Sequence, residues 1–441
     1  MSITRRNALL SGLFGAGWVG LRAFATGLPL SLIANPRRAL ADNSFMCFDA
    51  TKAQYLILST SGGGDPMNAN VPGTYGAPAI IHPADPSMAP TTMMIGGQPW
   101  LAAKPWAQLP QPIIDRTCFF HHTTLTNSHA NESKVLKLMG AVKRQEMLVS
   151  VIARQLAPCL GTVQTEPVAI GGESLSFNGR TLPVLTPVAL RDILTATAGP
   201  LTQLQRVRDA DLNRINAVLK QSGTKDQRDF LDQMVVSQTQ SRAIAQDLLD
   251  SLASVKDNGA TGQITTAIAL IRMNVSSVVS IHIPFGGDNH TDTDLLGEAA
   301  QTVAGVGAIG SLMTQLAAQG LSDRVTFAAM NVFGRTLTNA QRTVDRRTQG
   351  RDHFASHHCT VLIGKAVRGS VIGGVGLRPM INDLTAMPID SKTGKPDLNG
   401  DIAFEDTLGC VGKTIAAAVG VDPKVLNDQI TIGQVVAPAL A

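Results

Sequence analysis

The segment GRDHFASHH, at Gly350–His358, holds four potential metal-ligating side chains, Asp352, His353, His357 and His358, within nine residues. Its nine residues contain one aspartate and three of the nine histidines in the sequence. The apolar run Cys359–Ile363 follows at once and has the length and composition of a buried strand. Carboxylate and imidazole groups together are ligands for hard or borderline divalent metals. The segment therefore predicts a metal site beside a strand.

Outward from this segment, short apolar runs alternate with longer amphipathic ones. The alternation predicts an α/β fold with a mostly parallel central sheet and helices on both faces. The stretch Asn70–Pro112 has no sustained periodicity and is expected to form a long loop, and Gly364–Gly376 a glycine-rich meander. Strands are expected at Gln54–Ser59, Thr117–His122, Ser277–Ile283, Val325–Met330 and Cys359–Ile363, and helices at Met147–Ala157, Ile264–Met273, Leu295–Gln319 and Asp406–Val419.

Polar side chains follow the expected strands at the ends where a parallel sheet places its functional crevice. Each one also has an ordinary role when taken alone. Asp65 is explained as a turn carboxylate, and Ser128 as the N-cap of a helix that runs to about Gly140. Their shared position at one edge predicts a common site. The residues at this edge are Asp65, Ser128, Asp288, His290, Arg335, Asp352 and His353.

The basic character of the chain comes from its first 41 residues. They carry five arginines and no acid, so that without them the formal charge falls from +4 to about −1. Arg5 and Arg6 precede a glycine-rich apolar run, and Ala39-Leu40-Ala41 supplies the small residues of a cleavage site. This pattern predicts a signal peptide for the twin-arginine export machinery and a periplasmic or secreted protein.

Two other classes of protein are disfavoured. An uncleaved membrane anchor is the alternative for residues 1–41, but Arg22 interrupts the apolar run, so we expect no stable transmembrane anchor. Aromatic residues make up only 4% of the chain, which argues against base-stacking surfaces, and we expect no nucleic acid partner. We expect residues 42–441 to form one domain, with a helical insertion at about 200–258.

Several motifs, in order along the chain, resemble those of the exported domain of unknown function 1501 family. This family is related to the alkaline phosphatase and sulfatase superfamily. Besides Gly350–His358, the motifs are GGGDPMN at Gly62–Asn68, GDNH at Gly287–His290, FGRT at Phe333–Thr336 and GVDP at Gly420–Pro423.

The resemblance implies an alkaline-phosphatase-like fold. It also implies divalent-metal-dependent hydrolysis of a phosphate or sulfate ester, on an anionic small molecule or a glycan. The implied metal is zinc, manganese, magnesium or calcium. Ser128 matches the position of the nucleophile, Arg335 would hold the anion, and His357 is a candidate for acid–base work. The implied metal residues are Asp65, Asp288, His290 and His353, with Asp352 beside them as a ligand or as a group that orients one.

The chain departs from the family at Val332, where the family usually has an acidic residue. Valine cannot bind a metal, so one metal subsite is expected to be missing. Hydrolysis could run on one ion, with His129, His357 or His358 as acid–base partners. The alternative is a non-catalytic envelope protein that uses a degenerate hydrolase fold for binding or assembly.

Overall fold

The computed structural model describes residues 54–162, 164–195, 250–285, 287–338, 350–378, 381 and 383–441, with a few isolated positions between 214 and 228. The expected signal peptide at 1–41 and most of the expected insertion at about 200–258 lie outside these residues. The chain divides into two compact units. Among the described residues, one unit contains those within 54–160, 165–184 and 277–441, and the other contains those within 161–164 and 185–276.

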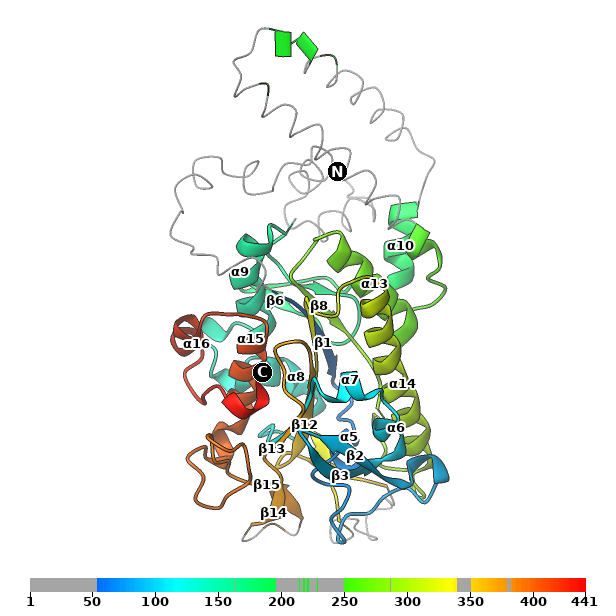
Figure 1. Ribbon diagram of the computed structural model, residues 1–441, viewed down its shortest axis with the longest axis vertical. Coiled ribbons are helices and arrows are strands. Elements are labelled where there is room, and N and C mark those ends of the chain that lie inside the picture. The colour runs from blue at the N-terminus through cyan, green and yellow to red at the C-terminus, as the bar shows by residue number, and fades with distance from the viewer. Residues whose placement is uncertain are drawn as a thin grey trace. The chain divides into compact units, whose positions relative to one another are not determined.

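The larger unit is built on a seven-stranded sheet (Figure 1). Only one strand, β12, runs antiparallel to its neighbours, so the mixed α/β class with a mostly parallel sheet is confirmed. The strands lie in the order β13 (Ser370–Ile372), β4 (Thr117–His122), β12 (His358–Ile363), β9 (Val325–Asn331), β1 (Tyr55–Ser61), β8 (Val278–Ile281) and β5 (Val168–Ala169).

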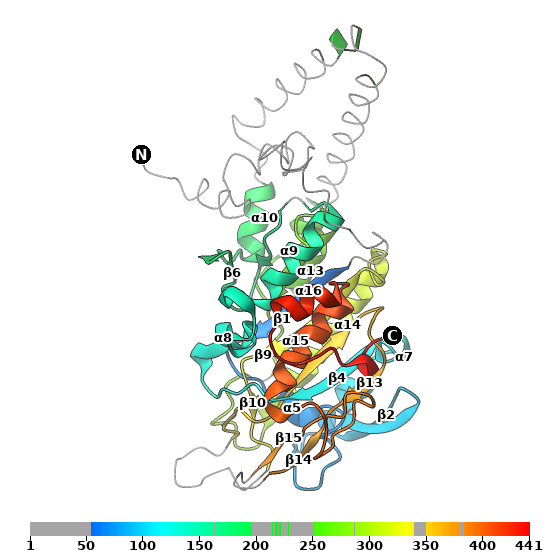
Figure 2. The same cartoon turned by 90° about the vertical axis from the view of Figure 1, so that its left-hand side faces the viewer.

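Helices of this unit lie on both sides of the sheet in the view of Figure 1, and Figure 2 shows the side covered by α15 and α16. The alternate strand residues Leu56, Leu58 and Phe120 share one buried core with α9 and α15. On the other side Trp106 of α6 packs edge-on against Phe119, with ring centroids 5.3 Å apart. The helices are α6 (Lys104–Ala107), α9 (Leu148–Leu160), α14 (Leu296–Ala318), α15 (Thr407–Ala418) and α16 (Pro423–Gln429).

Two expectations for the local structure were wrong. The long loop expected at Asn70–Pro112 contains a hairpin, because Gly96 and Gly97 both adopt positive φ and close a two-residue turn. The helix expected to run to Gly140 ends early, at α8 (Glu132–Leu136), because Leu138 and Met139 both have positive φ. Short elements of this unit include α5 (Met67–Asn70), β2 (Pro90–Ile95), β3 (Gln98–Ala103), α7 (Gln111–Ile114), β6 (Ser176–Phe177), β7 (Arg180–Thr181), β10 (Gly334–Arg335), β11 (His353–Phe354), β14 (Val375–Leu377) and β15 (Leu384–Ala386).

The smaller unit includes the helices α10 (Pro187–Thr195) and α13 (Ala260–Arg272). Its buried apolar cluster joins Ala269 of α13 to Leu252 and Val255. None of the helices described in either unit is long and apolar enough to cross a membrane.

The reversed direction of β12 brings the histidine-rich segment to the functional edge of the sheet. The first residue of β12, His358, pairs with His122, which is the last residue of β4. The parallel neighbours β9 and β1 end together, with Asn331 beside Ser61. The start of β12 therefore lies at the edge where the other strands end, and the residues that precede it join the loops that leave those strands.

Candidate metal centre

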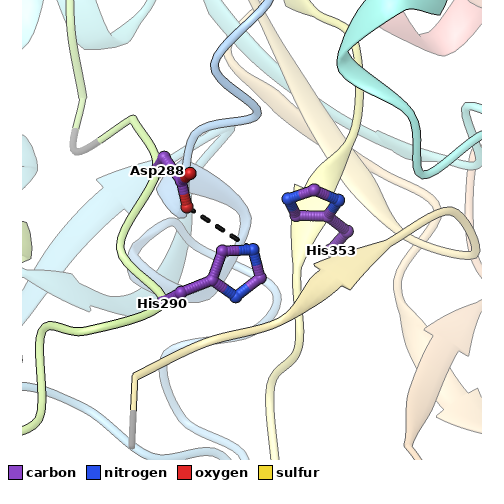
Figure 3. Close-up of side chains that lie close together, drawn as sticks. All are labelled: Asp288, His290 and His353. Carbon is purple, nitrogen blue, oxygen red and sulfur yellow. Dashed lines mark ion pairs between the residues drawn. The ribbon is translucent and has the colours of Figure 1, made fainter. Parts of the chain in front are cut away.

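Three side chains at this edge form a group that fits a metal ion. Asp288 and His290 lie in the loop after β8, and His353 lies in β11, which pairs with Arg335 of β10. Their ligand atoms all lie within 4.8 Å of one another (Figure 3). Among the described residues this is the one such group of histidine, cysteine and acidic side chains. The resemblance to the hydrolase family had indicated all three.

The hydrogen bonds of His353 prepare it to be a ligand. Its Nδ1 lies 2.8 Å from the backbone oxygen of Asn127, which can only accept, so Nδ1 carries the proton. Nε2 then holds the lone pair, and it is buried without a hydrogen-bond partner among the described residues. Burial, and then the charge of Arg335, lower the pKa of His353, which keeps the ring neutral. A neutral imidazole oriented through Nδ1 is the usual state of a metal-bound histidine.

His290 lies between two carboxylates. Its Nε2 is 3.5 Å from Oδ1 of Asp288, and its Nδ1 is 3.2 Å from Oδ1 of Asp352, without an aligned hydrogen bond. Asp352 was expected among the metal residues as a ligand or an orienting group. It lies outside the group of three, behind His290, where a carboxylate orients the ring of a ligand.

Arg335 was expected to hold an anion, but its guanidinium group contacts the protein instead. Its side chain is fully buried, and its Nε and Nη2 donate to the backbone oxygens of Gly64 and Gly63 at 2.6 and 2.7 Å. Nη2 also donates to Gly287 at 3.1 Å and lies 3.4 Å from Asp288. Nη1 lies 3.4 Å from Nε2 of His290 and 3.5 Å from the backbone oxygen of Arg351, so all three guanidinium nitrogens face protein groups. Arg335 instead holds together the loops after β1 and β8.

Asp65, expected as a ligand, also lies outside the group of three. Its carboxylate is fully buried and accepts from Nδ2 of Asn331 at 2.6 Å and from the backbone nitrogen of Gly287 at 3.2 Å. Burial raises the pKa of Asp65 to about 6, although the nearby His282 opposes the shift. Val332 is buried in the apolar core. The side-chain amide of Asn331 thus donates to the carboxylate of Asp65. Asn331 directly precedes Val332, the position at which a metal ligand was expected to be missing.

Ser128 is exposed at the start of a short 3-10 helix, His129–Asn131, and its side chain does not cap this helix. Both of its neighbours contact the site. The carbonyl of Asn127 orients His353, and Nδ1 of His129 lies 2.5 Å from the carbonyl of Gly62. The ring centroids of His129 and His353 are 4.4 Å apart. The backbone therefore places Ser128 between two residues of the site.

The position of His357 does not suit acid–base work. Its ring is fully buried, with Nδ1 3.2 Å from Nδ2 of Asn68 and Nε2 3.0 Å from Nδ1 of His121. Nε2 of His121 lies 2.8 Å from the carbonyl of Pro72. Nδ2 of Asn68 can only donate, and the carbonyl of Pro72 can only accept. Both imidazole rings are therefore neutral, and both nitrogens of each ring take part in hydrogen bonds. His358 is also fully buried, and burial, followed by the charge of His122, holds its pKa well below the usual value.

We expect the His121 position to contribute to the pH dependence of stability. Burial lowers the pKa of His121 to about 4, whereas an unfolded imidazole titrates near 6.5. Below pH 6.5 the unfolded chain binds a proton that the folded chain excludes, so this contribution to stability is lost as the pH falls towards 4. His121→Gln should destabilise the protein at pH 7.5, and by about 1 kcal/mol less at pH 5.5. Urea unfolding at both pH values checks this, and an equal penalty at both would contradict it.

The formal charges at the site favour a cation. Asp288 and Asp352 contribute two negative charges and Arg335 one positive charge, so that with neutral histidines the balance is −1. Burial alone would raise the pKa of Asp288, but the neighbouring charge of Arg335 helps to lower it overall, which keeps the carboxylate ionised. Two imidazoles and one carboxylate are a typical set of protein ligands for a catalytic metal.

Two residues of the site could not have been found from side-chain patterns. Asn127 acts through its carbonyl, which every residue has, and Asn331 acts through an amide whose partner, Asp65, lies 266 positions earlier in the chain. A scan against models of protein families and a search of curated proteins returned no match to the chain.

Proposed function

We propose that the protein binds one divalent metal ion through Asp288, His290 and His353 and hydrolyses a phosphate or sulfate ester. The observation that carries the proposal is the buried Nε2 of His353, which holds a lone pair without a partner among the described residues. It belongs to the group whose ligand atoms lie within 4.8 Å of one another. A bound divalent ion would supply Lewis acidity, which polarises the ester and stabilises the negative charge that develops.

The ligand set narrows the choice of metal. Two imidazole nitrogens suit zinc and other first-row transition metals, whereas magnesium and calcium prefer sites made of oxygen ligands. Three protein ligands leave room for water or substrate on a four- or five-coordinate ion. We therefore favour zinc or manganese over magnesium or calcium.

We also propose that the fold is of the alkaline phosphatase type and that the protein is exported by the twin-arginine route. The mostly parallel sheet and the motifs gathered at one of its edges support the proposed fold. Asn331 donates to Asp65, and Val332 supplies no ligand at the position of the second subsite, which supports a site for one ion. The export proposal rests on the arginine pair and the small residues before residue 42.

Ser128 is the proposed nucleophile. Its backbone lies between Asn127 and His129, which both contact the site, and its hydroxyl-bearing side chain is exposed. Ser128 Oγ would form a bond to phosphorus or sulfur, the bond to the ester oxygen would break, and the serine proton would leave with the alcohol. Water would then cleave the covalent intermediate, releasing phosphate or sulfate and restoring the hydroxyl.

Replacing Ser128 by alanine should abolish turnover of para-nitrophenyl phosphate or sulfate without changing metal affinity or stability. The reason is that the exposed hydroxyl makes no cap bond and is not a ligand in the proposed set. Ser133→Ala, a change of a nearby serine in α8, is the matched control and should keep full activity. Turnover that survives in Ser128→Ala would show that this serine is not the nucleophile.

A binding role without catalysis is the second candidate. The specific observation in its favour is Arg335, whose Nε and Nη2 are taken by three backbone carbonyls, so that the expected anion clamp is absent from the described site. A metal-loaded protein that turns over no phosphate or sulfate ester in a broad screen, yet binds inorganic phosphate or sulfate, would favour this role.

A further inference from the structure

We infer that Glu298 is a positioning residue that fixes the spacing of the proposed metal ligands. It lies in the first turn of α14, its side chain is fully buried, and it is not one of the three ligands. Its carboxylate bridges the two chain segments that carry them. This inference rests on the proposed metal site and adds a residue that the motifs of the sequence do not indicate.

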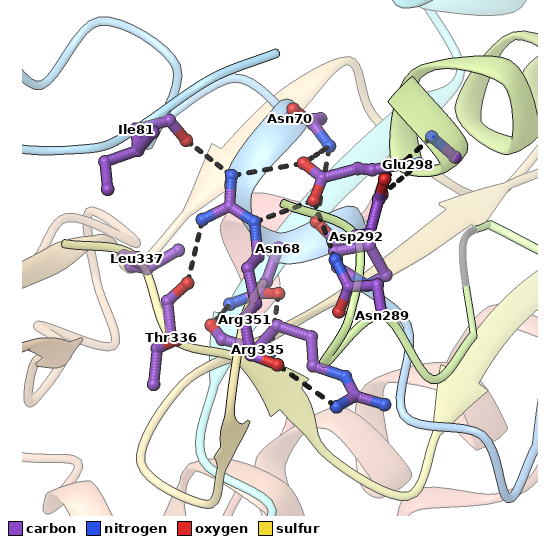
Figure 4. A network of polar contacts seen from close by, with 12 residues as sticks. Asn68, Asn70, Ile81, Asn289, Asp292, Glu298, Arg335, Thr336, Leu337 and Arg351 are labelled. Carbon is purple, nitrogen blue, oxygen red and sulfur yellow. Dashed lines mark hydrogen bonds and ion pairs between the residues drawn. The ribbon is translucent and has the colours of Figure 1, made fainter. Parts of the chain in front are cut away.

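One side of the bridge is a buried ion pair with Arg351 (Figure 4). Nε of Arg351 donates to Oε2 of Glu298 at 2.7 Å, and Nη2 donates to Oε1 at 3.1 Å. The remaining donors of the guanidinium bind the backbone oxygens of Thr336, at 2.8 Å, and of Ile81. Arg351 directly precedes Asp352 and His353, so this bidentate pair fixes the start of the segment that supplies one ligand.

The other side of the bridge is Asn289, which lies between the ligands Asp288 and His290. Its Nδ2 donates to Oε2 of Glu298 at 3.0 Å. Its Oδ1 is buried and has no hydrogen-bond partner among the described residues. The hydrogen bond from Asn289 to Glu298 thus holds the middle of the loop that carries the ligands Asp288 and His290.

The backbone fixes the same geometry. Both oxygens of Asp292 accept from backbone nitrogens of the first turn of α14, Gly297 at 3.0 Å and Glu298 at 2.8 Å, which holds Glu298 in place. The nitrogen of Gly350 donates to the oxygen of His290 at 2.8 Å. Since metal affinity depends on the placement of ligands by groups that do not touch the ion, loss of the bridge should weaken binding.

Asn70 provides a matched control. Its Nδ2 donates to Oε1 of the same carboxylate at 2.9 Å, it is buried, and its Oδ1 also lacks a partner among the described residues. It belongs to α5, which carries no ligand of the group. Asn289→Ala and Asn70→Ala each remove one amide donor and leave the ion pair of Glu298 and Arg351 intact. The two variants differ in one respect: Asn289 lies in a segment that carries proposed metal ligands, whereas Asn70 lies in α5, which carries none.

The experiment is a titration of the full chain with zinc chloride, followed by calorimetry, together with urea unfolding of the metal-free proteins. We expect both variants to lose similar amounts of stability. Asn289→Ala should bind zinc about tenfold or more weakly, the range typical of lost orienting groups, while Asn70→Ala stays within about twofold of wild type. If both variants bind zinc as wild type does, or if both weaken equally, the positioning role is overturned.

A double-mutant cycle tests whether Asn289 acts through Glu298. Glu298→Met keeps the length of the side chain and removes both acceptor oxygens, and we expect weaker zinc binding. Adding Asn289→Ala to this variant should then change affinity less than about twofold, because the two residues act as one unit. Additive losses would overturn the inference. If Glu298→Met fails to fold, the comparison of Asn289→Ala with Asn70→Ala decides, because neither unpairs Arg351.

Failure of the inference is distinguishable from failure of the proposed function. If the wild-type chain binds no zinc, the proposed metal site is wrong and the inference falls with it. If the wild type binds zinc and Asn289→Ala binds it equally well, only the positioning role of Glu298 is wrong.

Discussion

Asp288→Asn is expected to reduce divalent-metal affinity by more than the roughly 10- to 100-fold typical of losing an orienting group. The substitution keeps the size of the side chain but removes the only carboxylate of the three-residue group. It also changes the formal charge of the site, with neutral histidines, from −1 to zero, because Arg335 and Asp352 then balance each other. Equilibrium dialysis followed by metal analysis measures the loss.

Asp294→Asn is the control for this experiment. Asp294 is an exposed carboxylate in the same loop between β8 and α14, and it lies outside the group of three ligands. Its neutralisation removes the same charge from the same loop, so the general electrostatic effect is matched. Equal losses of affinity in both variants would contradict the assignment of Asp288 as a ligand.

Gly350→Ala is expected to destabilise the folded protein by about 3 kcal/mol or more. A methyl group at this position would lie 1.8 Å from the carbonyl oxygen of Asn289 and 2.7 Å from that of His290, and backbone atoms cannot turn aside as a side chain can. The two ligand-bearing segments would have to separate, so metal affinity should fall as well. Urea unfolding and a zinc titration measure the two effects.

Gly307→Ala is the matched control for this substitution. A methyl group at Gly307 would meet no atom within 4 Å, and the residue lies in the interior of α14. Alanine favours the helix by about 0.5–1 kcal/mol over glycine, so this variant should be more stable than wild type and should bind metal equally well. A Gly350→Ala protein as stable as wild type would contradict the close approach of the two segments.

The strands of the central sheet could be predicted because their apolar runs are continuous and short. Thr117–His122 has the bounds expected from sequence. The direction of β12 could not be predicted, since an apolar run such as Cys359–Ile363 reads the same for a parallel or an antiparallel strand. The hairpin of β2 and β3 could not be recognised from its strands, because polar and apolar residues do not alternate clearly along them. The pair Gly96-Gly97 is nevertheless a recognised signal for a two-residue turn.

The candidate site was predictable only in part. Asp288, His290 and His353 belong to motifs whose residue types suit metals, and the fold brings them together. The positions of Asp65, Arg335 and His357 depend on partners far away in the sequence, and such pairings leave no local pattern. Arg335, for example, donates to Gly64, which lies 271 positions earlier in the chain.

The most direct test of the account is the amount of zinc or manganese bound by the purified chain after dialysis against the metal. We predict one ion per chain, and a chelator should lower the thermal stability, because an ion that binds only the folded state stabilises it. At a free metal concentration 100 times the dissociation constant the difference should be about 2.7 kcal/mol. A chain that retains no ion and unfolds at the same temperature with and without chelator would contradict the proposed metal centre.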